Sequence, residues 1–498
     1  MVRVDSLGHS RRKGKYEACH HRGWPYNSAL MDVWQWTGSA LAAVAALLAV
    51  LAAGHALLYK RMPQSAFGWI AVCVMLPLAG ALLYYLFGIN RVERRARALR
   101  GDEARHTPPA PIAARAPTGL EPLDALATRL SRRPLLGGNR VTALYDGERA
   151  FPAMLEAIEA ARERAFLATY IFDSGRTGRA FASALGAAAK RGVTTRVLLD
   201  GVGELYSFPR ARTLLRRSGV DVGRFIPPRL WPPSLHANLR NHRKILVTDG
   251  RIAFTGGMNI GERHVAEASS PHRVADLHFS FEGPVAGQLE AVFLDDWHFA
   301  TGEALDVSSV TAEGRGEALC RAIEDGPDRE LGKLRSLIGG ALCLARRSVT
   351  IMTPYFLPTR ELIGMLQAAA LRGVAVTIIL PARNNLPYVH RATRHTLWEL
   401  LERGVRVYYQ PPPFAHTKLL LVDDAYAMVG SANLDPRSLR LNFELDVEIY
   451  DPPLVSELSQ HCEAVRRRSE EITLAGVDGR PLPTRLLDGA AWLFSPYL

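Results

Sequence analysis

The sequence contains little cysteine. Five of its 498 residues are Cys, and no two of them are spaced as Cys-x-x-Cys: Cys19, Cys73, Cys320, Cys343 and Cys462. An odd, scattered set of this kind excludes a disulfide scaffold and a zinc site built from cysteine pairs. The tripeptide Cys19-His20-His21 has no distant ligand that would complete a metal cage. We therefore expect no metal and no other cofactor.

Acidic residues are outnumbered by basic ones. The chain has 61 Lys and Arg against 49 Asp and Glu, a formal net charge of +12. Such an excess indicates an anionic partner, which could be nucleic acid, an anionic membrane or an anionic substrate. The basic residues cluster in segments 1–30 and 91–100, on either side of an apolar region. This placement favours charges that orient a membrane segment over a nucleic-acid-binding patch.

Charge is absent from two long apolar runs, residues 38–58 and 67–87. Each has about 21 residues, which is enough to cross a hydrocarbon core of about 30 Å as a helix. The first run is also too long for a typical signal peptide. Two buried helices of a soluble protein are disfavoured, because both runs are apolar on every side. We expect a two-helix transmembrane hairpin within residues 31–90.

The flanking charges predict the orientation of this hairpin. Six basic residues precede it and five follow it, whereas the turn contains only Lys60 and Arg61. The positive-inside rule then places both ends, and everything after residue 90, in the cytoplasm. Residues 1–30 are interpreted as a basic N-terminal tail, with a start at Met31 as the alternative. Residues 91–130 are basic and rich in proline, which predicts a linker or an irregular ordered arm.

The rest of the chain is internally repeated. Strand-like, helix-like and strand-like segments follow one another at residues 165–171, 178–190 and 193–199, and again at residues 349–355, 361–370 and 374–380. This alternation predicts an α/β fold of mixed sheets flanked by helices. We expect two pseudo-symmetric halves, residues 131–300 and 336–498, joined by an acidic, turn-rich connector at residues 301–335.

One polar pattern, H-x-K-x4-D-x6-G-[GS]-x-N, occurs once in each half. Its first copy is His242, Lys244, Asp249, Gly256, Gly257 and Asn259, and its second copy is His416, Lys418, Asp423, Gly430, Ser431 and Asn433. His and Lys alternate along a predicted strand and so share one face. A single H-x-K would be a weak signal. Two copies in register, each with the Gly and Asn tail, predict one active site built from two half-sites.

These residue types suit phosphoryl transfer on a diester. One neutral His can attack phosphorus and form a covalent phosphohistidine. The other can protonate the leaving alkoxide and then deprotonate the incoming alcohol. Two Lys and two Asn side chains can bind the non-bridging oxygens, so the protein itself supplies the cations. The pattern alone leaves open phospholipid transfer, phospholipid hydrolysis and nucleic-acid cleavage.

The motif segments resemble the phospholipase D superfamily and, more narrowly, bacterial cardiolipin synthases of that type. The similar segments are residues 239–245, 253–261, 416–423 and 429–435, with further similarity at 293–297, 437–444 and 493–496. The resemblance extends over about residues 38–498. One departure is Gly257, where many superfamily members have Ser. Cardiolipin synthases commonly show this asymmetry, which implies that the two half-sites are unequal.

The resemblance implies roles for the motif residues. His242 would be the nucleophile and His416 the general acid and base. The phosphate would be bound by Lys244, Lys418, Asn259 and Asn433. Asp249 and Asp423 would orient local structure instead of contacting phosphorus. Asp276 and Glu444 would each hydrogen-bond a catalytic His and fix its tautomer, with ordinary surface pairing as the alternative for both.

The apolar hairpin then favours a lipid substrate over nucleic acid. The implied reaction transfers a phosphatidyl group from one phosphatidylglycerol to the hydroxyl of a second, giving cardiolipin and glycerol. We expect an integral protein of the bacterial inner membrane with phosphatidylglycerol and anionic membrane lipid as partners, no nucleic acid, and an oligomeric state left open. The alternatives are a membrane-anchored phospholipase D hydrolase, a phosphatidyltransferase that uses phosphatidylethanolamine, and an inactive interaction scaffold.

Overall fold

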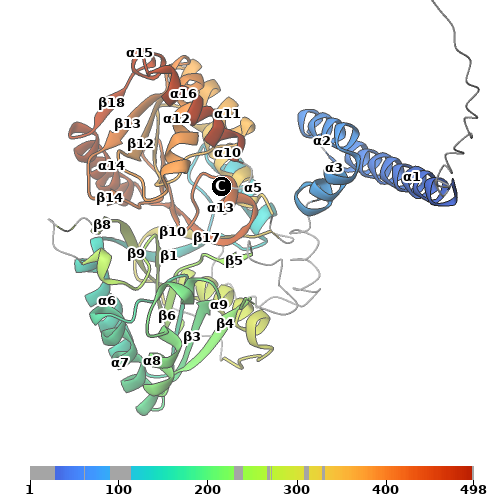
Figure 1. The fold of residues 1–498 in the computed structure, drawn as a ribbon. Coiled ribbons are helices and arrows are strands. Elements are labelled where there is room, and N and C mark those ends of the chain that lie inside the picture. Colours follow the sequence, from blue (N-terminus) through green and yellow to red (C-terminus); the bar gives the residue numbers. More distant parts are fainter. Residues whose placement is uncertain are drawn as a thin grey trace, which may run out of the picture. The chain divides into compact units, whose positions relative to one another are not determined.

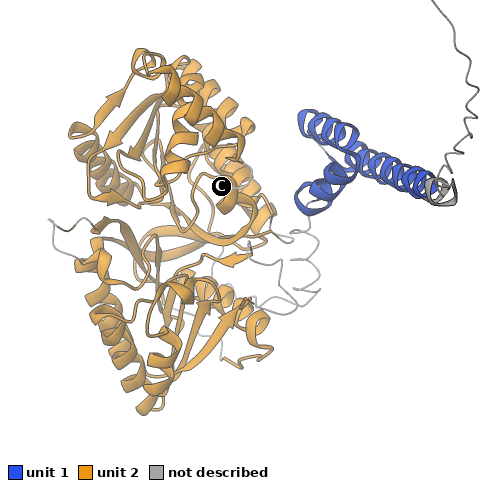
Figure 2. Ribbon diagram, in the orientation of Figure 1, with its two compact units in different colours: residues 1–91 blue, residues 92–498 orange. Residues whose placement is uncertain are grey.

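The structure is a computed structural model. It describes residues 28–60, 62–89, 114–228, 239–265, 270, 272–307, 313–327 and 331–495. The predicted basic tail therefore lies, up to residue 27, outside the described residues. The chain divides into two compact units, residues 1–91 and 92–498 (Figure 2).

The first unit is helical and apolar. It contains α1 (Ser28–Tyr59), α2 (Pro63–Met75), α3 (Pro77–Leu83) and a π-helical turn η1 (Tyr84–Gly88). Within α1, Trp34–Tyr59 has 26 residues and a mean hydropathy of 2.3. Among the described residues, α1 is the one helix long and apolar enough to cross a membrane.

The predicted hairpin of two spanning helices is not confirmed, because the second apolar run is broken. Pro77 has no backbone N–H and disfavours helical dihedrals at the residue before it. Leu76 accordingly has φ −130° and ψ 73°, and α2 ends before it. A Cβ on Gly80 would lie 2.3 Å from the Val72 carbonyl oxygen, so α3 packs closely on α2. The turn η1, which follows α3, contacts α1: the Tyr84 hydroxyl lies 2.7 Å from Nδ1 of His55.

This contact determines where the second run ends. His55 lies near the C-terminal end of α1, whereas a simple hairpin would bring Tyr84 towards the N-terminal end of α1. The run therefore turns back at Leu76 and returns towards the level of Tyr59. In this arrangement residues 63–88 form two short helices that double back on each other beside α1.

The first half of the second unit begins with a helix and a strand and ends with a long buried helix (Figure 1). Its elements are α5 (Glu121–Ser131), β1 (Leu136–Tyr145), α6 (Asp146–Ala160), β2 (Arg164–Thr169), α7 (Arg176–Lys190), β3 (Thr194–Asp200), η2 (Gly203–Tyr206), α8 (Ala211–Arg217), β4 (Asp221–Phe225), β5 (Arg240–Asn241), β6 (Ile245–Thr248), β7 (Ile252–Gly256), η4 (Glu262–His264), β8 (Val274–Ala275), β9 (Leu277–Glu282) and α9 (Val285–Thr301).

The second half repeats this order and adds three elements at its end. Its elements are β10 (Ala318–Asp325), α10 (Lys333–Leu344), β11 (Ser348–Met352), α11 (Arg360–Leu371), β12 (Ala375–Pro381), α12 (Pro387–Leu401), β13 (Arg406–Gln410), β14 (Phe414–Ala415), β15 (Leu419–Val422), β16 (Tyr426–Gly430), α13 (Pro436–Arg440), β17 (Asn442–Tyr450), α14 (Pro452–Arg467), β18 (Glu470–Ile472), α15 (Leu474–Asp478) and α16 (Leu482–Leu493).

One continuous sheet runs through both halves. Its order is β18-β13-β12-β11-β15-β16-β17-β10-β1-β9-β7-β6-β2-β3-β4, with β5 paired to β17. The strands β2, β3 and β4 are parallel, as are β11, β12 and β13, because helices connect them. The halves meet where β1 and β10 pair antiparallel. The α/β fold with two repeats is therefore confirmed, and the repeats share one sheet.

Two predicted boundaries differ from the structure. The connector expected at residues 301–335 contains β10, a central strand that pairs with β1 and β17. The linker expected at residues 91–130 contains most of α5, whose Leu123 and Ala127 are buried. Both segments have a polar or proline-rich sequence, which is typical of loops, and their buried elements were therefore not predicted. In β10, for example, the buried Arg321 pairs with Glu448 of β17 at 2.9 Å.

Three large apolar cores hold the second unit together. The central core combines both halves and contains much of α9 and α14. The second lies under α6 and α7, and the third lies under α10 and α11 and also includes buried residues of α5. In β2, alternate residues belong to different cores: Phe166 to the central one and Leu167 to the peripheral one. The sheet is thus covered on both faces, as expected for parallel strands.

Candidate active site

Each motif lies where the chain passes from one half to the other. The strand β5 before His242 pairs with the start of β17 in the second half, whereas β6 after Lys244 pairs with β2 of its own half. In the second motif, β14 pairs with β8 of the first half and β15 pairs with β11. The prediction of a continuous strand through His242 and Lys244 was therefore wrong, because the chain changes its pairing partner at these residues.

The backbone fixes both histidines across the halves. The His242 N–H donates to the Phe443 carbonyl at 2.9 Å, and the His416 N–H donates to the Ala275 carbonyl at 2.8 Å. The two motifs are equivalent in this respect. Each His is held by a strand that belongs to the other repeat.

The side chains repeat this crossing. His242 Nδ1 lies 2.9 Å from Glu444 Oε2, and His416 Nδ1 lies 2.8 Å from Asp276 Oδ2. Both carboxylates are buried, which excludes surface pairing as an explanation of these contacts. An Nδ1–H donated to a carboxylate leaves the Nε2 lone pair of the ring for chemistry.

The two carboxylates differ in their surroundings. Glu444 also accepts hydrogen bonds from Ser431 Oγ at 2.6 Å and from Asn442 Nδ2 at 3.0 Å. Burial alone would raise its pKa, but His242, Lys244 and the Ser431 hydroxyl lower the pKa below its usual value. Asp276 accepts from the Leu277 N–H at 2.9 Å, and burial raises its pKa. Glu444 is thus the more firmly ionised partner.

Gly257 and Asp276 explain the departure from the GSxN pattern in the first half. A Cβ at Gly257 would lie 2.3 Å from Asp276 Oδ1, so even a methyl group conflicts with the carboxylate. In the second half the longer Glu444 leaves room for Ser431 to donate to it. Each half therefore matches the residue after the first motif glycine to its carboxylate: Gly257 leaves space for Asp276, and Ser431 hydrogen-bonds Glu444.

Both histidines are neutral in this environment. Burial lowers the pKa of His242, and Glu444 only partly opposes this shift. Burial lowers the pKa of His416 further, and the nearby Lys418 and Lys244 charges add to the effect. Aromatic rings line each imidazole: Tyr170 lies 5.3 Å from His242 between ring centroids, and Tyr355 lies 6.4 Å from His416.

The two lysines lie beside the histidines. Lys244 Nζ donates to the His242 carbonyl at 2.6 Å. Lys418 Nζ donates to the His416 carbonyl and lies 2.8 Å from His416 Nδ1. Burial lowers the pKa of Lys244 to about 7 and that of Lys418 to about 8. An anion at this place would restore the charge of both ammonium groups.

The two asparagines lie at equivalent turns. Asn259 Oδ1 accepts from the Ile171 N–H at 3.1 Å, so its amide N–H groups face the other way. Asn433 Nδ2 donates to Ser438 Oγ at 3.2 Å. The buried Asn433 Oδ1 has no hydrogen-bond partner among the described residues. Turning this amide lets Oδ1 accept from the Ser438 hydroxyl and frees Nδ2, as in Asn259.

Asp249 and Asp423 contact backbone, not histidine. Asp249 accepts from the N–H groups of residues 162–164 at 2.8 to 3.0 Å. Asp423 does the same for residues 346–348 at 2.7 to 3.1 Å. Each aspartate has a positive φ, 52° and 51°, at the hairpin turn. They tie this turn to the start of the neighbouring strand, which is the kind of contact expected of residues that orient local structure.

Sequence reasoning missed two site residues, Arg243 and Asp296. Arg243 is fully buried between the first motif's His and Lys; its Nη1 donates to Asp296 at 2.8 Å and its Nε donates to the Glu444 carbonyl at 3.0 Å. Asp296 also accepts from Asn241 Nδ2 at 3.0 Å. The signal in the sequence was that both residues are charged and lie in segments similar to the family, residues 239–245 and 293–297, without an assigned role.

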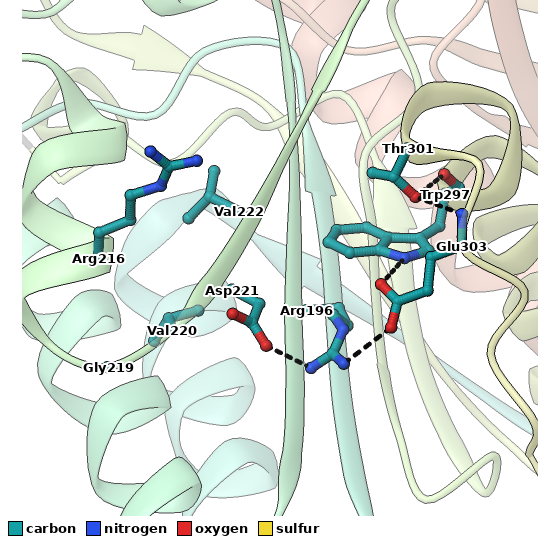
Figure 3. Close-up of a pocket in the computed structure, with 9 residues that line it drawn as sticks. All are labelled: Arg196, Arg216, Gly219, Val220, Asp221, Val222, Trp297, Thr301 and Glu303. Carbon is teal, nitrogen blue, oxygen red and sulfur yellow. Dashed lines mark hydrogen bonds and ion pairs between the residues drawn. The ribbon is translucent and has the colours of Figure 1, made fainter.

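A surface depression lies elsewhere, at the outer edge of the sheet. It has a volume of about 640 Å³ and is lined by residues of β4, α8 and α9 with Arg196 of β3 (Figure 3). Arg196 pairs there with Asp221 at 2.8 Å and with Glu303 at 3.2 Å. Its charge is therefore already neutralised, and none of the motif residues lines this depression.

Comparison with known proteins agrees with this geometry. A family model described as "Cardiolipin synthase, PLD-like domain" matches residues 154–297 and 340–466, and one described as "Phospholipase_D-nuclease N-terminal" matches residues 47–88. The cardiolipin synthase of Geobacillus thermodenitrificans is 32% identical over 455 residues, which cover 89% of this chain and 90% of that protein. Cardiolipin synthase A of Pseudomonas putida is 32% identical over 91% of this chain and 96% of its own length.

The chain belongs to the cardiolipin synthase family. Among solved structures, phosphatidylserine synthase of Haemophilus influenzae Rd KW20 aligns with a TM-score of 0.57 at 15% identity, over 76% of this chain and 100% of that one. At this identity the likeness concerns the fold. It places the second unit in the phospholipase D fold.

The close contact at Gly257 gives a testable prediction. In Gly257→Ala the new methyl group must displace Asp276, and the hydrogen bond from His416 to Asp276 weakens. We expect the turnover number to fall by about 10- to 100-fold, part of what a general acid and base contributes, as measured by the initial rate of phosphatidyl transfer.

The matched control is Gly261→Ala, whose Cβ would meet nothing closer than 3.6 Å. This variant should keep the parent rate. Equal rates for Gly257→Ala and the parent would contradict the proposed coupling between residue 257 and His416.

Proposed function

We propose that this chain makes cardiolipin and glycerol by phosphatidyl transfer between two phosphatidylglycerol molecules. Membership of the cardiolipin synthase family makes it a phosphatidyltransferase of the phospholipase D type. The observation that carries the proposal is the pair of motif histidines, each with Nδ1 on a buried carboxylate and a lysine beside it. That arrangement suits two successive displacements at one phosphorus atom.

In the first step His242 Nε2 attacks phosphorus of the first phosphatidylglycerol. The phosphorus–oxygen bond to the head-group glycerol breaks. His416, whose doubly protonated form is favoured by the negative charge of the bound phosphate, gives its Nε2 proton to the departing oxygen. The phosphatidyl group is then bound to His242, and glycerol leaves. Glu444 stabilises the charge that develops on the His242 ring, which is why the more firmly ionised carboxylate is assigned to the nucleophile.

In the second step a primary hydroxyl of the second phosphatidylglycerol takes the place of the departed glycerol. His416, now neutral, removes the hydroxyl proton while the oxygen attacks phosphorus. The bond to His242 breaks and cardiolipin is released. Lys244, Lys418 and the amides of Asn259 and Asn433 bind the non-bridging oxygens in both steps.

Product analysis tests this reaction. The purified full chain, incubated with phosphatidylglycerol in detergent, should yield cardiolipin and glycerol in equal amounts by mass spectrometry. His242→Ala and His416→Ala should each lower the rate by about 10³-fold or more. Phosphatidic acid as the main product would instead support the hydrolase alternative, and a need for added phosphatidylethanolamine would support the other transferase.

Peptide mass spectrometry separates the roles of the two histidines. After rapid quenching, a phosphatidyl group should be found on His242 in the parent and in His416→Ala, and on neither residue in His242→Ala. A phosphatidyl group on His416 in the His242→Ala variant would reverse the assignment.

The lowered lysine pKa values predict a pH dependence. Lys244 and Lys418, with pKa values of about 7 and about 8, lose their positive charge as the pH rises. The lowered pKa of His242 favours its unprotonated, nucleophilic form. We expect kcat/KM for phosphatidylglycerol to fall as the pH rises from about 7 towards about 9.

The dependence at saturating substrate is the internal control. A bound phosphate raises the pKa of both lysines, so the decline of kcat should occur at higher pH than the decline of kcat/KM. A kcat/KM that increases from neutral to alkaline pH would contradict the assignment of the lysines to phosphate binding.

We further propose that the catalytic unit faces the cytoplasm of the bacterial inner membrane. We take residues 63–88 as re-entrant, entering and leaving the membrane on one side, so that the basic residues before them (Lys60, Arg61) and after them (five arginines in segment 91–100) belong to one side of the membrane. The positive-inside rule then assigns this side to the cytoplasm. A second full crossing by residues 63–88, as in the predicted hairpin, would leave the catalytic unit in the same compartment but move the first 30 residues.

Two cysteines test both statements with a membrane-impermeant maleimide on spheroplasts. The exposed Cys343, in a Cys19→Ser background, should be labelled only after permeabilisation. Cys19, in a Cys343→Ser background, should be labelled in intact spheroplasts if residues 63–88 are re-entrant and protected if they cross. Labelling of Cys343 in intact spheroplasts would place the catalytic unit outside.

A further inference from the structure

A short apolar loop follows β3 and lies beside the first motif histidine. It presents Leu205, Tyr206 and Phe208, which are 49%, 68% and 94% exposed. The Tyr206 ring lies 6.4 Å from Tyr170, and Tyr170 lies 5.3 Å from His242. One aromatic side chain therefore separates this exposed surface from a reacting imidazole.

The loop is held firmly in this position. Asp200 Oδ1 accepts from the N–H groups of Val202 and Gly203 at 2.9 Å each, while its Oδ2 accepts from the Asn241 N–H at 2.9 Å. Asn241 directly precedes His242. The buried Glu204 pairs with Arg224 at 2.8 Å. The exposed apolar side chains are thus fixed to the strand that carries the histidine.

The second half presents a similar surface beside His416. Tyr388, at the start of α12, is 48% exposed, and Leu493 and Phe494, at the end of α16, are 68% and 64% exposed. The adjacent Val389 and Trp492 belong to a small core that also includes Tyr355. Tyr355 in turn contacts His416. This small core therefore lies between the exposed surface and the histidine.

The structure assigns these six residues, the apolar rim, to docking of the catalytic unit on the lipid bilayer. The rim consists of Leu205, Tyr206, Phe208, Tyr388, Leu493 and Phe494. This inference rests on the proposed function, because it specifies how the two-chain lipid substrate reaches the histidines. Apolar side chains that enter the bilayer beside the site would let phosphatidylglycerol slide in with its acyl chains still among lipid.

Charge and position favour the bilayer over a protein as the occupant. The exposed Arg210 follows Phe208 by two residues, and the exposed Arg391 lies one turn after Tyr388. Aromatic and apolar side chains with arginine next to them are typical of the interface of anionic membranes. All the rim residues except those of α16 follow the carboxyl ends of parallel strands, the edge of the sheet at which both motif histidines lie.

The test uses the full chain reconstituted in vesicles of phosphatidylglycerol and phosphatidylethanolamine. Cys19→Ser and Cys343→Ser remove the reactive cysteines, and the other three are not competitors because they are buried. An environment-sensitive dye is then attached through Phe208→Cys, Phe494→Cys or, as the matched control, Leu371→Cys. Leu371 is 67% exposed and ends α11, which leads into the opposite end of β12.

We expect blue-shifted emission and quenching by lipids with nitroxide-labelled acyl chains at positions 208 and 494, and neither effect at 371. Quenching at 208 and 494 no stronger than at 371 would overturn the proposal. A blue shift without lipid quenching would also overturn it: dependence on the protein-to-lipid ratio would indicate a second copy of the chain, and independence would indicate the chain's own first unit.

A kinetic test separates docking from chemistry. The double variant Leu205→Ser with Phe208→Ser should raise the apparent KM for vesicle phosphatidylglycerol by about tenfold. Its kcat/KM for a short-chain, monomeric phosphatidylglycerol should equal that of the parent, and Leu371→Ser should change neither value. An unchanged KM on vesicles would overturn docking, whereas a parent protein without transfer on the monomeric substrate would overturn the proposed function.

Discussion

The reciprocal hydrogen bonds between histidine and carboxylate are the interaction on which the site depends. His242 is held by Glu444, and His416 by Asp276, so each repeat contains a histidine whose partner lies in the other repeat. Both pairs are buried, where a carboxylate that loses its partner is costly. The short pairings of β5 with β17 and of β14 with β8 bring these groups together. Continuity of the sheet through β1 and β10 keeps the two crossings in register.

The site departs from exact symmetry, so the two similar histidines have different surroundings. Ser431 and Asn442 surround Glu444 with donors, whereas Gly257 gives Asp276 space but no hydroxyl group. The second asymmetry is Arg243, which is buried in the first motif and occupies the position of Thr417 in the second. Its ion pair with Asp296 joins α9 to the strand that carries His242; removing one partner of such a pair typically costs about 3–5 kcal/mol. The first histidine is thus the more rigidly held of the two.

Much of this organisation could be predicted from the sequence. The repeated strand, helix and strand segments predicted β2, α7 and β3, and β11, α11 and β12, to within a few residues, because their apolar runs are buried on both faces. The doubled motif predicted the histidines and lysines that the structure brings together. Contacts between distant segments could not be predicted in the same way. The crossing at His242 requires knowing that Arg240 pairs with Asn442, and β10 is concealed because its charged residues are neutralised by partners far along the chain. Pro77 is the sequence signal for the helix break at Leu76, but the uniformly apolar residues around it favoured the prediction of one continuous helix.

The crossed strand pairing has a consequence for the history of the two repeats. A change in the segment around Asp276 alters the environment of His416, and a change around Glu444 alters that of His242. Compensating substitutions must therefore arise in the opposite repeat. The motif of one repeat and the carboxylate-bearing strand of the other must therefore change together, whereas the motif and the carboxylate of the same repeat need not. Suppressors of a damaged first motif are accordingly to be sought in β17, and an exchange of one repeat between relatives separates both histidines from the partners with which they evolved.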